Sequence, residues 1–394
     1  MTDTRGILLS NQAKKIERET EVASACMARD YKGFGNQAQT EKVMSAYAIY
    51  RLPHEDHATL IRQTEGNPLE LHSLTELNGK QGFVVAPFEV KANQPILVIQ
   101  GESRSVECGV WSEKCNADEK AVRGNLTPHS SLHTPHYKID FANYHSQLEA
   151  DNFRKIVLAR CADEKMGEKV EPMGLFYRAC EMYPRMFIAL VETEKSGCWL
   201  TATPEILLDG KGNDWRTIAL AGTMKLEGEQ LDGEGETLTW STKNIQEQRI
   251  VATYITECLE QFTGNFREEG PKTVRAANLV HLRSDFTFKL EDNNHIGDVL
   301  NTLHPTPAVC GLPKREAFQF IVKNEHSPRR YYSGFMGPLG ATETHLYVSL
   351  RCMNIDGDTC HLYAGGGLLK DSVEEQEWLE TEAKMETMRR LLYV

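Results

Sequence analysis

A glycine run, Ala364-Gly365-Gly366-Gly367, precedes a segment in which charged residues recur at helical spacing. Glu377, Glu380 and Lys384 stand at offsets of 0, 3 and 7, which places their side chains on one stripe of an α-helix. The stripe continues into Met388, so we expect it to face the interior. Two inward carboxylates beside a glycine-lined turn suit Mg²⁺, which prefers carboxylate and water oxygens. The alternative is a surface ion pair, because Glu380 and Lys384 have the favourable order for one.

Another carboxylate, Glu247, lies four residues before Val251, at the head of an apolar stripe in a predicted helix over residues 241–262. There it either interacts with the helix dipole in the first turn or points toward a ligand. Together with Glu380, which is far away in the sequence, Glu247 could complete a two-carboxylate Mg²⁺ site. Spacing alone leaves both interpretations open.

Arg351 lies in a run of alternating residues. From His345 to Met353 every second residue is apolar, which predicts one continuous strand. A buried arginine needs a partner, and a carboxylate is the usual one because it accepts two parallel hydrogen bonds from the guanidinium. The partner is either a protein Asp or Glu or a carboxylate of the substrate.

Two further ionisable residues border apolar segments. Lys155 precedes the run Ile156-Val157-Leu158-Ala159, so its side chain either extends to solvent or is buried. Buried lysines can act as general bases near neutral pH. Glu205 follows Thr203-Pro204, where it either caps a turn or serves as a general acid.

The segments that must position these residues alternate in type. The N-terminal third contains short strand-like runs between turn signals, at residues 46–50, 69–71, 82–86 and 96–99. Residues 102–135 are rich in Ser, Glu, Asn, Pro and His and have weak periodicity, which predicts a mobile loop.

Strands and helices are mixed without strict βαβ order, and no segment after residue 151 has the composition of a linker. We therefore expect an α/β fold of the α+β type, with layered sheets and helices. The prediction is a single domain over residues 1–394, with an N-terminal half over 1–150 and a motif-bearing catalytic half over 151–394.

Composition limits the class of protein. The 394 residues are 40% hydrophobic and 25% charged, which is typical of a globular chain with a large core. The net charge of −12 argues against nucleic acid as a partner, and an anionic substrate must meet a locally positive site. The ten cysteines include no C-x-x-C pair, which argues against zinc and redox motifs. We find no secretory signal and no membrane-spanning run, so we expect a cytoplasmic protein without a membrane partner.

A set of motifs occurs in order along the chain, at residues 153–160, 202–208, 220–223, 303–313, 332–337, 349–352 and 364–384. In this order they resemble the chorismate-binding enzymes, and among these the isochorismate synthases. Residues 82–88 also look like the N-terminal half of the family.

The resemblance implies a single large layered domain, an active site between two layers, a requirement for Mg²⁺, and chorismate as the substrate. The implied reaction adds water at C2 of the ring and expels the C4 hydroxyl, giving isochorismate reversibly, an isomerisation overall. By resemblance Lys155 is the general base for the water, and Glu205 is the general acid for the departing hydroxyl.

The resemblance also implies the binding residues. Glu247 and Glu380 would hold the cation, with Glu377 nearby or bound through water. Arg351 would pair with the carboxylate of the enolpyruvyl side chain. The other implied substrate-binding residues are Gly222, Thr223, His281, Tyr332, Gly365 and Lys384. The family often has histidine where this chain has Gln248.

Relatives of the family differ at two of these positions. Those that make anthranilate usually carry glutamine at the position of Lys155, and those that make aminodeoxychorismate usually carry lysine at that of Ala221. The combination in this chain therefore favours water as the nucleophile. No glutamine-hydrolysing Cys–His module is found, so no glutamine amidotransferase subunit is expected as a partner.

Two alternatives remain: a salicylate synthase, which would go on to eliminate pyruvate, and a non-catalytic metabolite-binding relative. The four intact residues Lys155, Glu205, Glu247 and Glu380 argue against the second alternative. Isochorismate feeds both menaquinone and catechol-siderophore pathways, and these motifs favour neither.

Overall fold

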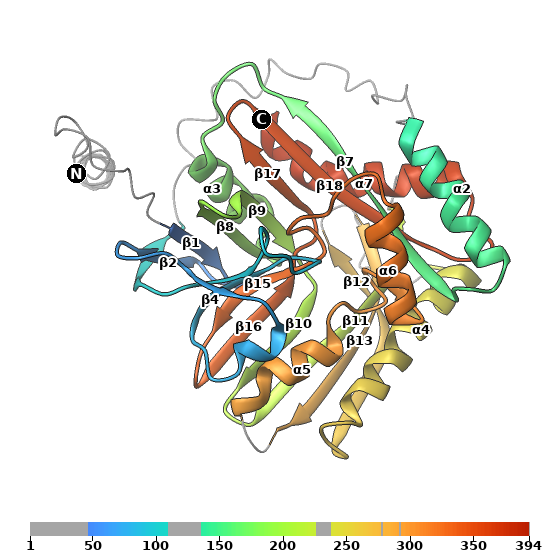
Figure 1. Cartoon of the computed structure of the whole chain (residues 1–394), viewed down its shortest axis with the longest axis horizontal. Coiled ribbons are helices and arrows are strands. Elements are labelled where there is room, and N and C mark those ends of the chain that lie inside the picture. Colours follow the sequence, from blue (N-terminus) through green and yellow to red (C-terminus); the bar gives the residue numbers. More distant parts are fainter. Residues whose placement is uncertain (1–45, 109–134, 226–237, 277–278, 291–292, 394) are drawn as a thin grey trace, which may run out of the picture. The chain divides into compact units, whose positions relative to one another are not determined.

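The computed structural model describes residues 46–108, 135–225, 238–276, 279–290 and 293–393 (Figure 1). All of them belong to the second of two compact units of the chain, Ser45–Val394. In this part of the chain the strands form two sheets of nine strands each, and both sheets combine strands from the two predicted halves. The division into an N-terminal and a catalytic half stays a prediction.

Sheet A is antiparallel throughout. Its strands in spatial order are β14 (Gly311–Leu312), β7 (Lys155–Lys165), β18 (Thr359–Leu368), β17 (Cys352–Asp356), β9 (Gly197–Thr203), β8 (Phe187–Thr193), β1 (Ala46–Arg51), β2 (His57–Gln63) and β6 (Glu102–Glu107).

Sheet B lies against one face of sheet A. Its strands in spatial order are β12 (Phe266–Ala276), β13 (Leu279–Lys289), β11 (Asp214–Lys225), β10 (Ile206–Lys211), β16 (Glu343–Val348), β15 (Phe335–Leu339), β4 (Gly82–Ala86), β5 (Ile96–Ile99) and β3 (Leu69–Leu71).

The described helices lie outside the two sheets (Figure 1). They are α2 (Pro135–Glu149), α3 (Pro172–Met182), α4 (Thr242–Leu259), α5 (Ile296–Leu303), α6 (Lys314–Asn324) and α7 (Glu374–Leu392), with short 3₁₀ helices η1 (Leu74–Leu77) and η3 (Asn293–His295).

Buried side chains define the layers. One cluster fills the space between the sheets, with Phe187 and Tyr347 stacked at 4.3 Å between ring centroids. A second packs α3 and α7 on the outer face of sheet A, and a third packs α4 and α5 on the outer face of sheet B. A fourth joins α2 and α6 to β7. The order helix, sheet, sheet, helix confirms the expected layered α+β fold.

Two helices carry the charged residues of interest, and their sequences explain their placement. α4 begins after Ser241, whose hydroxyl accepts a hydrogen bond from the Asn244 N–H over 3.2 Å, as expected of an N-cap. Its apolar stripe, including Val251 and Ile255, is buried against sheet B. α7 buries Met388 against sheet A, so the predicted inward stripe is confirmed there.

The predicted continuous strand over residues 345–353 is wrong. β16 ends at Val348 in sheet B and β17 begins at Cys352 in sheet A, so the chain crosses between the sheets in the intervening three residues. The alternating apolar residues face different clusters, because Val348 packs on the outer face of sheet B whereas Cys352 packs between the sheets. Arg351 has φ +48°, a left-handed conformation that is rare for a residue with a side chain, and the crossing places it between the sheets.

The loop predicted over residues 102–135 is wrong at its start. Glu102–Glu107 forms β6, an exposed edge strand paired with β2. Neither face of this strand is buried, so it lacks the apolar alternation by which strands are found in a sequence. The end of this loop is also helical, because α2 begins at Pro135. Residues 109–134 lie outside the described residues. Within the described ranges, no helix is long and apolar enough to cross a membrane.

Candidate functional site

A narrow pocket lies between the sheets, with walls from β7 and β18 of sheet A and from β11 and β13 of sheet B. Its volume is about 60 Å³, below the roughly 300 Å³ of ordinary ligand pockets, so side chains must move apart to admit a ring-sized ligand. Most of the residues predicted from sequence line it, namely Glu205, Gly222, Thr223, Glu247, His281, Tyr332, Arg351, Gly365 and Lys384.

Lys155, predicted as a base, is the first residue of β7 and is completely buried. Its Nζ lies 2.8 Å from Oε1 of Glu247 on α4. The ammonium makes no hydrogen bond of good geometry with a described residue, so part of its hydrogen-bonding capacity is unused. Burial alone would raise the pKa of Glu247, but the charge of Lys155 outweighs it and lowers that pKa. Glu247 is therefore ionised.

The glycine run makes room for this ion pair. A Cβ on Gly367 would lie 2.2 Å from Glu247 Oε1 and 2.7 Å from Lys155 Cε. A Cβ on Gly365 would lie 2.8 Å from the Tyr332 hydroxyl. The predicted glycine-lined turn is wrong, because the run lies inside strand β18, where close side chains rather than a turn require glycine.

Glu205, predicted as an acid, follows β9 and lines the same pocket, with 4% of its surface exposed. Burial raises the pKa of its carboxyl to about 7, against the opposing positive charges of Lys155, Arg351 and Lys384. A carboxyl with this pKa is substantially protonated at neutral pH and can donate a proton. The pocket therefore holds a carboxylic acid that feels the charge of the buried Lys155 amine behind its wall.

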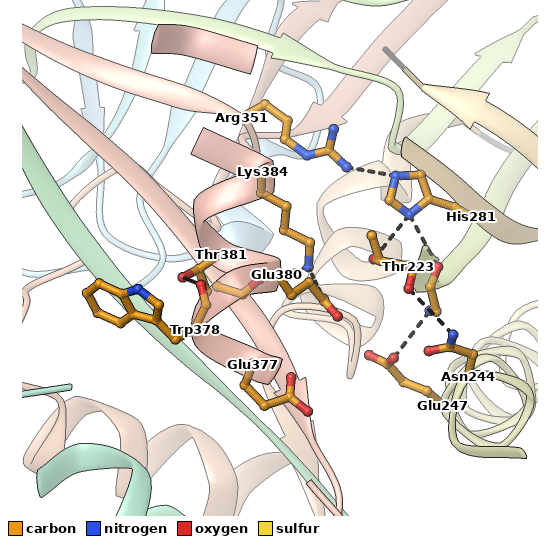
Figure 2. A network of polar contacts seen from close by, with 12 residues as sticks. Thr223, Asn244, Glu247, His281, Arg351, Glu377, Trp378, Glu380, Thr381 and Lys384 are labelled. Atoms are coloured by element: carbon orange, nitrogen blue, oxygen red, sulfur yellow. Dashed lines mark hydrogen bonds and ion pairs between the residues drawn. The ribbon is translucent and has the colours of Figure 1, made fainter. Parts of the chain in front are cut away.

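Arg351 points to His281 across the pocket (Figure 2). Its Nη2 donates to Nε2 of His281 over 2.8 Å, so the described protein partner of this nitrogen is an imidazole rather than an Asp or Glu, while the substrate carboxylate stays a prediction. Burial, followed by the charges of Arg351 and Lys384, lowers the pKa of His281 well below its ordinary value, so the ring is neutral and Nε2 accepts. Nη1 of Arg351 is buried and has no partner among the described residues. It is the natural donor for an anionic ligand.

Gly222 and Thr223 hold the histidine from a bulge in β11. The Gly222 carbonyl accepts from Nδ1 of His281 over 3.2 Å, and the Thr223 hydroxyl lies 3.3 Å from the same nitrogen. The Gly222 N–H donates to Oε2 of Glu247 over 3.3 Å. Gly222 has φ +71°, which explains why glycine is required there.

Helix α7 presents Glu377, Glu380 and Lys384 on the side where Glu247 lies (Figure 2). Lys384 Nζ lies 2.7 Å from Glu380 Oε1 and donates to the carbonyl of Gly365 over 2.9 Å. The i,i+4 ion pair considered from sequence is therefore present, and its lysine lines the pocket rather than lying on the free surface.

Glu377 is 1% exposed and forms an ion pair with Lys243 of α4. Its Oε2 makes no hydrogen bond of good geometry among the described residues, although the Ser372 hydroxyl lies near this carboxylate. Burial, and next the negative charge of Glu380, raises the pKa of Glu377. Glu377 and Glu380 are thus close enough for their negative charges to repel each other.

The donor chemistry of Glu247, Glu377 and Glu380 fits a hard divalent cation such as Mg²⁺. All three offer oxygen atoms, and one buried oxygen lacks a good partner. A Cβ on Gly366 would lie 3.2 Å from Glu377 Oε2, so glycine also keeps this space clear. Each carboxylate contacts one lysine. Within the described ranges these three carboxylates do not form a group whose ligand atoms all lie within 4.8 Å of one another, so cation binding requires them to converge.

Two polar residues of α4, Lys243 and Asn244, were missed in the sequence, and a third, Gln248, was noted only as a departure from the family. Lys243 contacts Glu377, and Asn244 donates from its side chain to the backbone of β11. Gln248 bonds the β11 backbone through both its amide oxygen and its nitrogen, so it holds the strand rather than the carboxylate group. Their positions could have revealed Lys243 and Asn244, because these residues lie four and three positions before Glu247 and therefore share its helix face.

Comparison with known proteins shows the family. A family model described as chorismate binding enzyme matches residues 72–393. Isochorismate synthase MenF of Escherichia coli strain K12 is 32% identical over 242 residues, which cover 60% of this chain and 56% of that protein. The salicylate biosynthesis isochorismate synthase of Pseudomonas aeruginosa is 32% identical over 253 residues, which cover 63% of this chain and 52% of that protein. The chain thus spans about half the length of these curated relatives.

The solved structure of the menaquinone-specific isochorismate synthase MenF from Escherichia coli has the same fold. It matches 91% of this chain and 92% of its own, with a TM-score of 0.71 and 21% identity. This likeness independently confirms the layered architecture expected from the sequence.

Replacing Gly367 by alanine should destabilise the fold. The new Cβ must displace the buried Glu247–Lys155 pair, and overpacking of this kind costs about 1–3 kcal/mol. Urea unfolding measures the loss. Gly264→Ala is the matched control, because a Cβ there meets no atom within 4 Å. Equal stability of the two variants would show that the glycine run does not hold the pair.

Glu205→Gln should stabilise the protein at alkaline pH. A raised carboxyl pKa gives stability that is present below the ordinary value of 4.5 and lost as pH rises through about 7. Glutamine cannot ionise, so the variant should gain up to about 3 kcal/mol at pH 8 and less than about 1 kcal/mol at pH 5. Urea unfolding at both values checks this, with the exposed Glu375→Gln as control. A gain that does not depend on pH would contradict the raised pKa.

Proposed function

Since the chain belongs to the chorismate-binding enzymes, we propose that it is an isochorismate synthase. It converts chorismate reversibly into isochorismate by adding water at C2 and expelling the C4 hydroxyl. The observation that carries this proposal is that Glu205, with a pKa of about 7, lines the same pocket as Glu247, whose carboxylate lies 2.8 Å from the buried amine of Lys155. The names of the two relatives described above support it.

Lys155 is the proposed general base. Lys155 acts once its ammonium has given its own proton to solvent: water beside Nζ then gives a proton to the amine as the water oxygen bonds to C2. This nitrogen makes no hydrogen bond of good geometry with a described residue, which supports a contact with that water. To accept a proton, Lys155 must leave its contact with Glu247, so the base is free only when this carboxylate is engaged elsewhere.

Glu205 is the proposed general acid. Its carboxyl gives a proton to the C4 hydroxyl as the C4–O bond breaks, and water departs. Water enters at C2 and water leaves from C4, so substrate and product have the same composition. In the reverse direction the Glu205 carboxylate takes a proton from water and the Lys155 ammonium donates one. A positioned acid or base contributes about 10²–10⁴-fold to the rate.

The cationic side of the pocket would orient the two carboxylates of the substrate. Arg351 would bind the enolpyruvyl carboxylate through its unpartnered Nη1, while His281 holds the guanidinium in place. Gly222 and Thr223 would border the ring carboxylate. Lys384 adds positive charge, and Gly365 and Tyr332 form the adjacent wall.

Glu247, Glu377 and Glu380 would hold Mg²⁺. When bound, the ion would neutralise these carboxylates and a carboxylate of the substrate. Glu247 would then no longer need Lys155 as its counter-charge, so the amine becomes available to water. The protein has a net charge of −12 and the proposed substrate is also an anion, so they repel each other. A bound cation would reduce this repulsion at the site.

The experiment that tests the proposal is incubation of the purified protein with chorismate, with and without Mg²⁺, followed by chromatography with mass detection. A Mg²⁺-dependent product of unchanged mass, approached from both directions, is expected. Salicylate and pyruvate formed at enzyme-dependent rates would identify a salicylate synthase instead. Conversion that requires ammonia would refute the assignment of Lys155 to water.

Lys155→Ala and Glu205→Gln should each lower turnover about 10²–10⁴-fold while chorismate still binds. Loss of Lys155 also leaves Glu247 buried without its partner, which costs about 3–5 kcal/mol. The double variant Lys155→Met with Glu247→Gln removes both charges and separates chemistry from stability. Lys165→Ala, at the exposed end of the same strand, is the control. Near-normal turnover of either single variant would disprove its proposed role.

Glu380→Gln should raise the Mg²⁺ concentration needed for half-maximal activity by at least about tenfold, because one oxygen ligand is lost. Excess Mg²⁺ should recover part of the activity. Calorimetric titration with Mg²⁺ gives the same comparison without turnover, and the exposed Glu375→Gln on the same helix is the control. The same Mg²⁺ affinity in wild type and Glu380→Gln would remove this residue from the metal site.

A further inference from the structure

Three side chains of different chemistry meet at the end of β7 and β18 away from the pocket. Cys161 and Asp163 are two residues apart on β7, so they share one face of the strand. His361 lies on β18 directly opposite Asp163 in the antiparallel register. In the part of the chain that the structure describes, these are the three His, Cys, Asp or Glu residues whose ligand atoms all lie within 4.8 Å of one another.

The distances within this trio are those of a partly assembled coordination site. Nδ1 of His361 lies 2.7 Å from Oδ1 of Asp163, and Sγ of Cys161 lies 3.9 Å from the same oxygen. A tetrahedral ion with bonds of about 2.0–2.3 Å separates its ligand atoms by about 3.3–3.8 Å. Side-chain shifts of less than about 1 Å therefore convert the present arrangement into a coordinating one.

The backbone beneath the trio is fixed and the side chains are accessible. β7 and β18 pair without interruption from Ile156 to Lys165, so the relative positions of the three Cα atoms are set by the ladder. The His361 side chain is 28% exposed and that of Asp163 is 68% exposed, which leaves an open path from solvent. Cys161 is half-buried against the cluster between the sheets.

We propose that Cys161, Asp163 and His361 form a second metal site, which takes a borderline-soft divalent cation of the Zn²⁺ type. A thiolate, an imidazole and a carboxylate are ligands that Zn²⁺ accepts together, and three protein ligands with one open position for water make a common zinc coordination. Mg²⁺ does not fit, because it prefers oxygen ligands only.

This site is separate from the carboxylate group of the pocket. His361 lies four residues along β18 from Gly365, a separation of about 13 Å in an extended strand. The two sites also differ in donor set, so two cations can distinguish them. The sequence contains no C-x-x-C pair and so gave no hint of zinc. The three proposed ligands come together through strand pairing rather than through short sequence spacing.

The test is a Zn²⁺ titration of the chelator-treated full-length protein, read by competition with a chromophoric chelator. Wild type should bind Zn²⁺ even in excess Mg²⁺. Cys161→Ser and His361→Gln should each weaken binding at least tenfold, since even indirect partners of metal ligands are worth about 10–100-fold. Cys108→Ser, at another half-buried cysteine, is the matched control and should bind as wild type does.

Two further readouts keep the proposal open to refutation. Co²⁺ bound by wild type should give a thiolate charge-transfer band that Cys161→Ser lacks. Zn²⁺ should raise the melting temperature of wild type and not that of His361→Gln, whose exposed position makes loss of the fold a minor concern. No binding of Zn²⁺ by wild type, or binding unchanged in both variants, would overturn the proposal.

Discussion

The buried contact between Lys155 and Glu247 is the constraint on which the rest of the site depends. An ammonium and a carboxylate 2.8 Å apart, with almost no exposure, are stable only if the surrounding backbone brings them together, because either charge alone costs several kcal/mol to bury. Lys155 begins β7 in sheet A, while Glu247 comes from α4, which packs on the outer face of sheet B. Gly367 between them supplies the space that a side chain would fill. Sheet pairing, helix packing and the glycine run are thus linked through one ion pair.

The same low-polarity environment gives the neighbouring groups their chemical properties. Burial raises the pKa of Glu205 to about 7, and it keeps the imidazole of His281 neutral so that it can accept from Arg351. A carboxyl that is protonated near neutrality and a guanidinium with one unpartnered nitrogen are what acid catalysis on an anionic substrate requires. Buried ionisable groups without full pairing destabilise the fold. The pocket therefore lowers the free energy of unfolding while it gives these groups the properties that a reaction needs.

Most of the pocket-lining residues were predicted from the sequence through the resemblance of its ordered motifs to the chorismate-binding enzymes, whereas spacing alone left their roles open. The inward stripe of α7, the helix that carries Glu247 and the layered α+β fold are all present. Three features could not be predicted in this way. The crossing at Arg351 is hidden because the sequence alternates without a break from β16 to β17, although Val348 and Cys352 pack against different clusters in different sheets. Lys243 was overlooked because its partner Glu377 is distant in sequence. The trio at Cys161 exists only through the register of β7 with β18, which depends on tertiary pairing.

The central claim is that Lys155 delivers a water molecule to the ring while Glu205 releases a different one. The most direct measurement is to run the reaction on chorismate in H₂¹⁸O with Mg²⁺ and to locate the label by mass spectrometry of the product. The account predicts one ¹⁸O atom in the C2 hydroxyl of isochorismate. It also predicts that the Lys155→Ala variant loses catalysis and therefore forms little of this labelled product. Product formed without label would mean that the hydroxyl moves within the substrate, and it would contradict the role of Lys155 as the base for water.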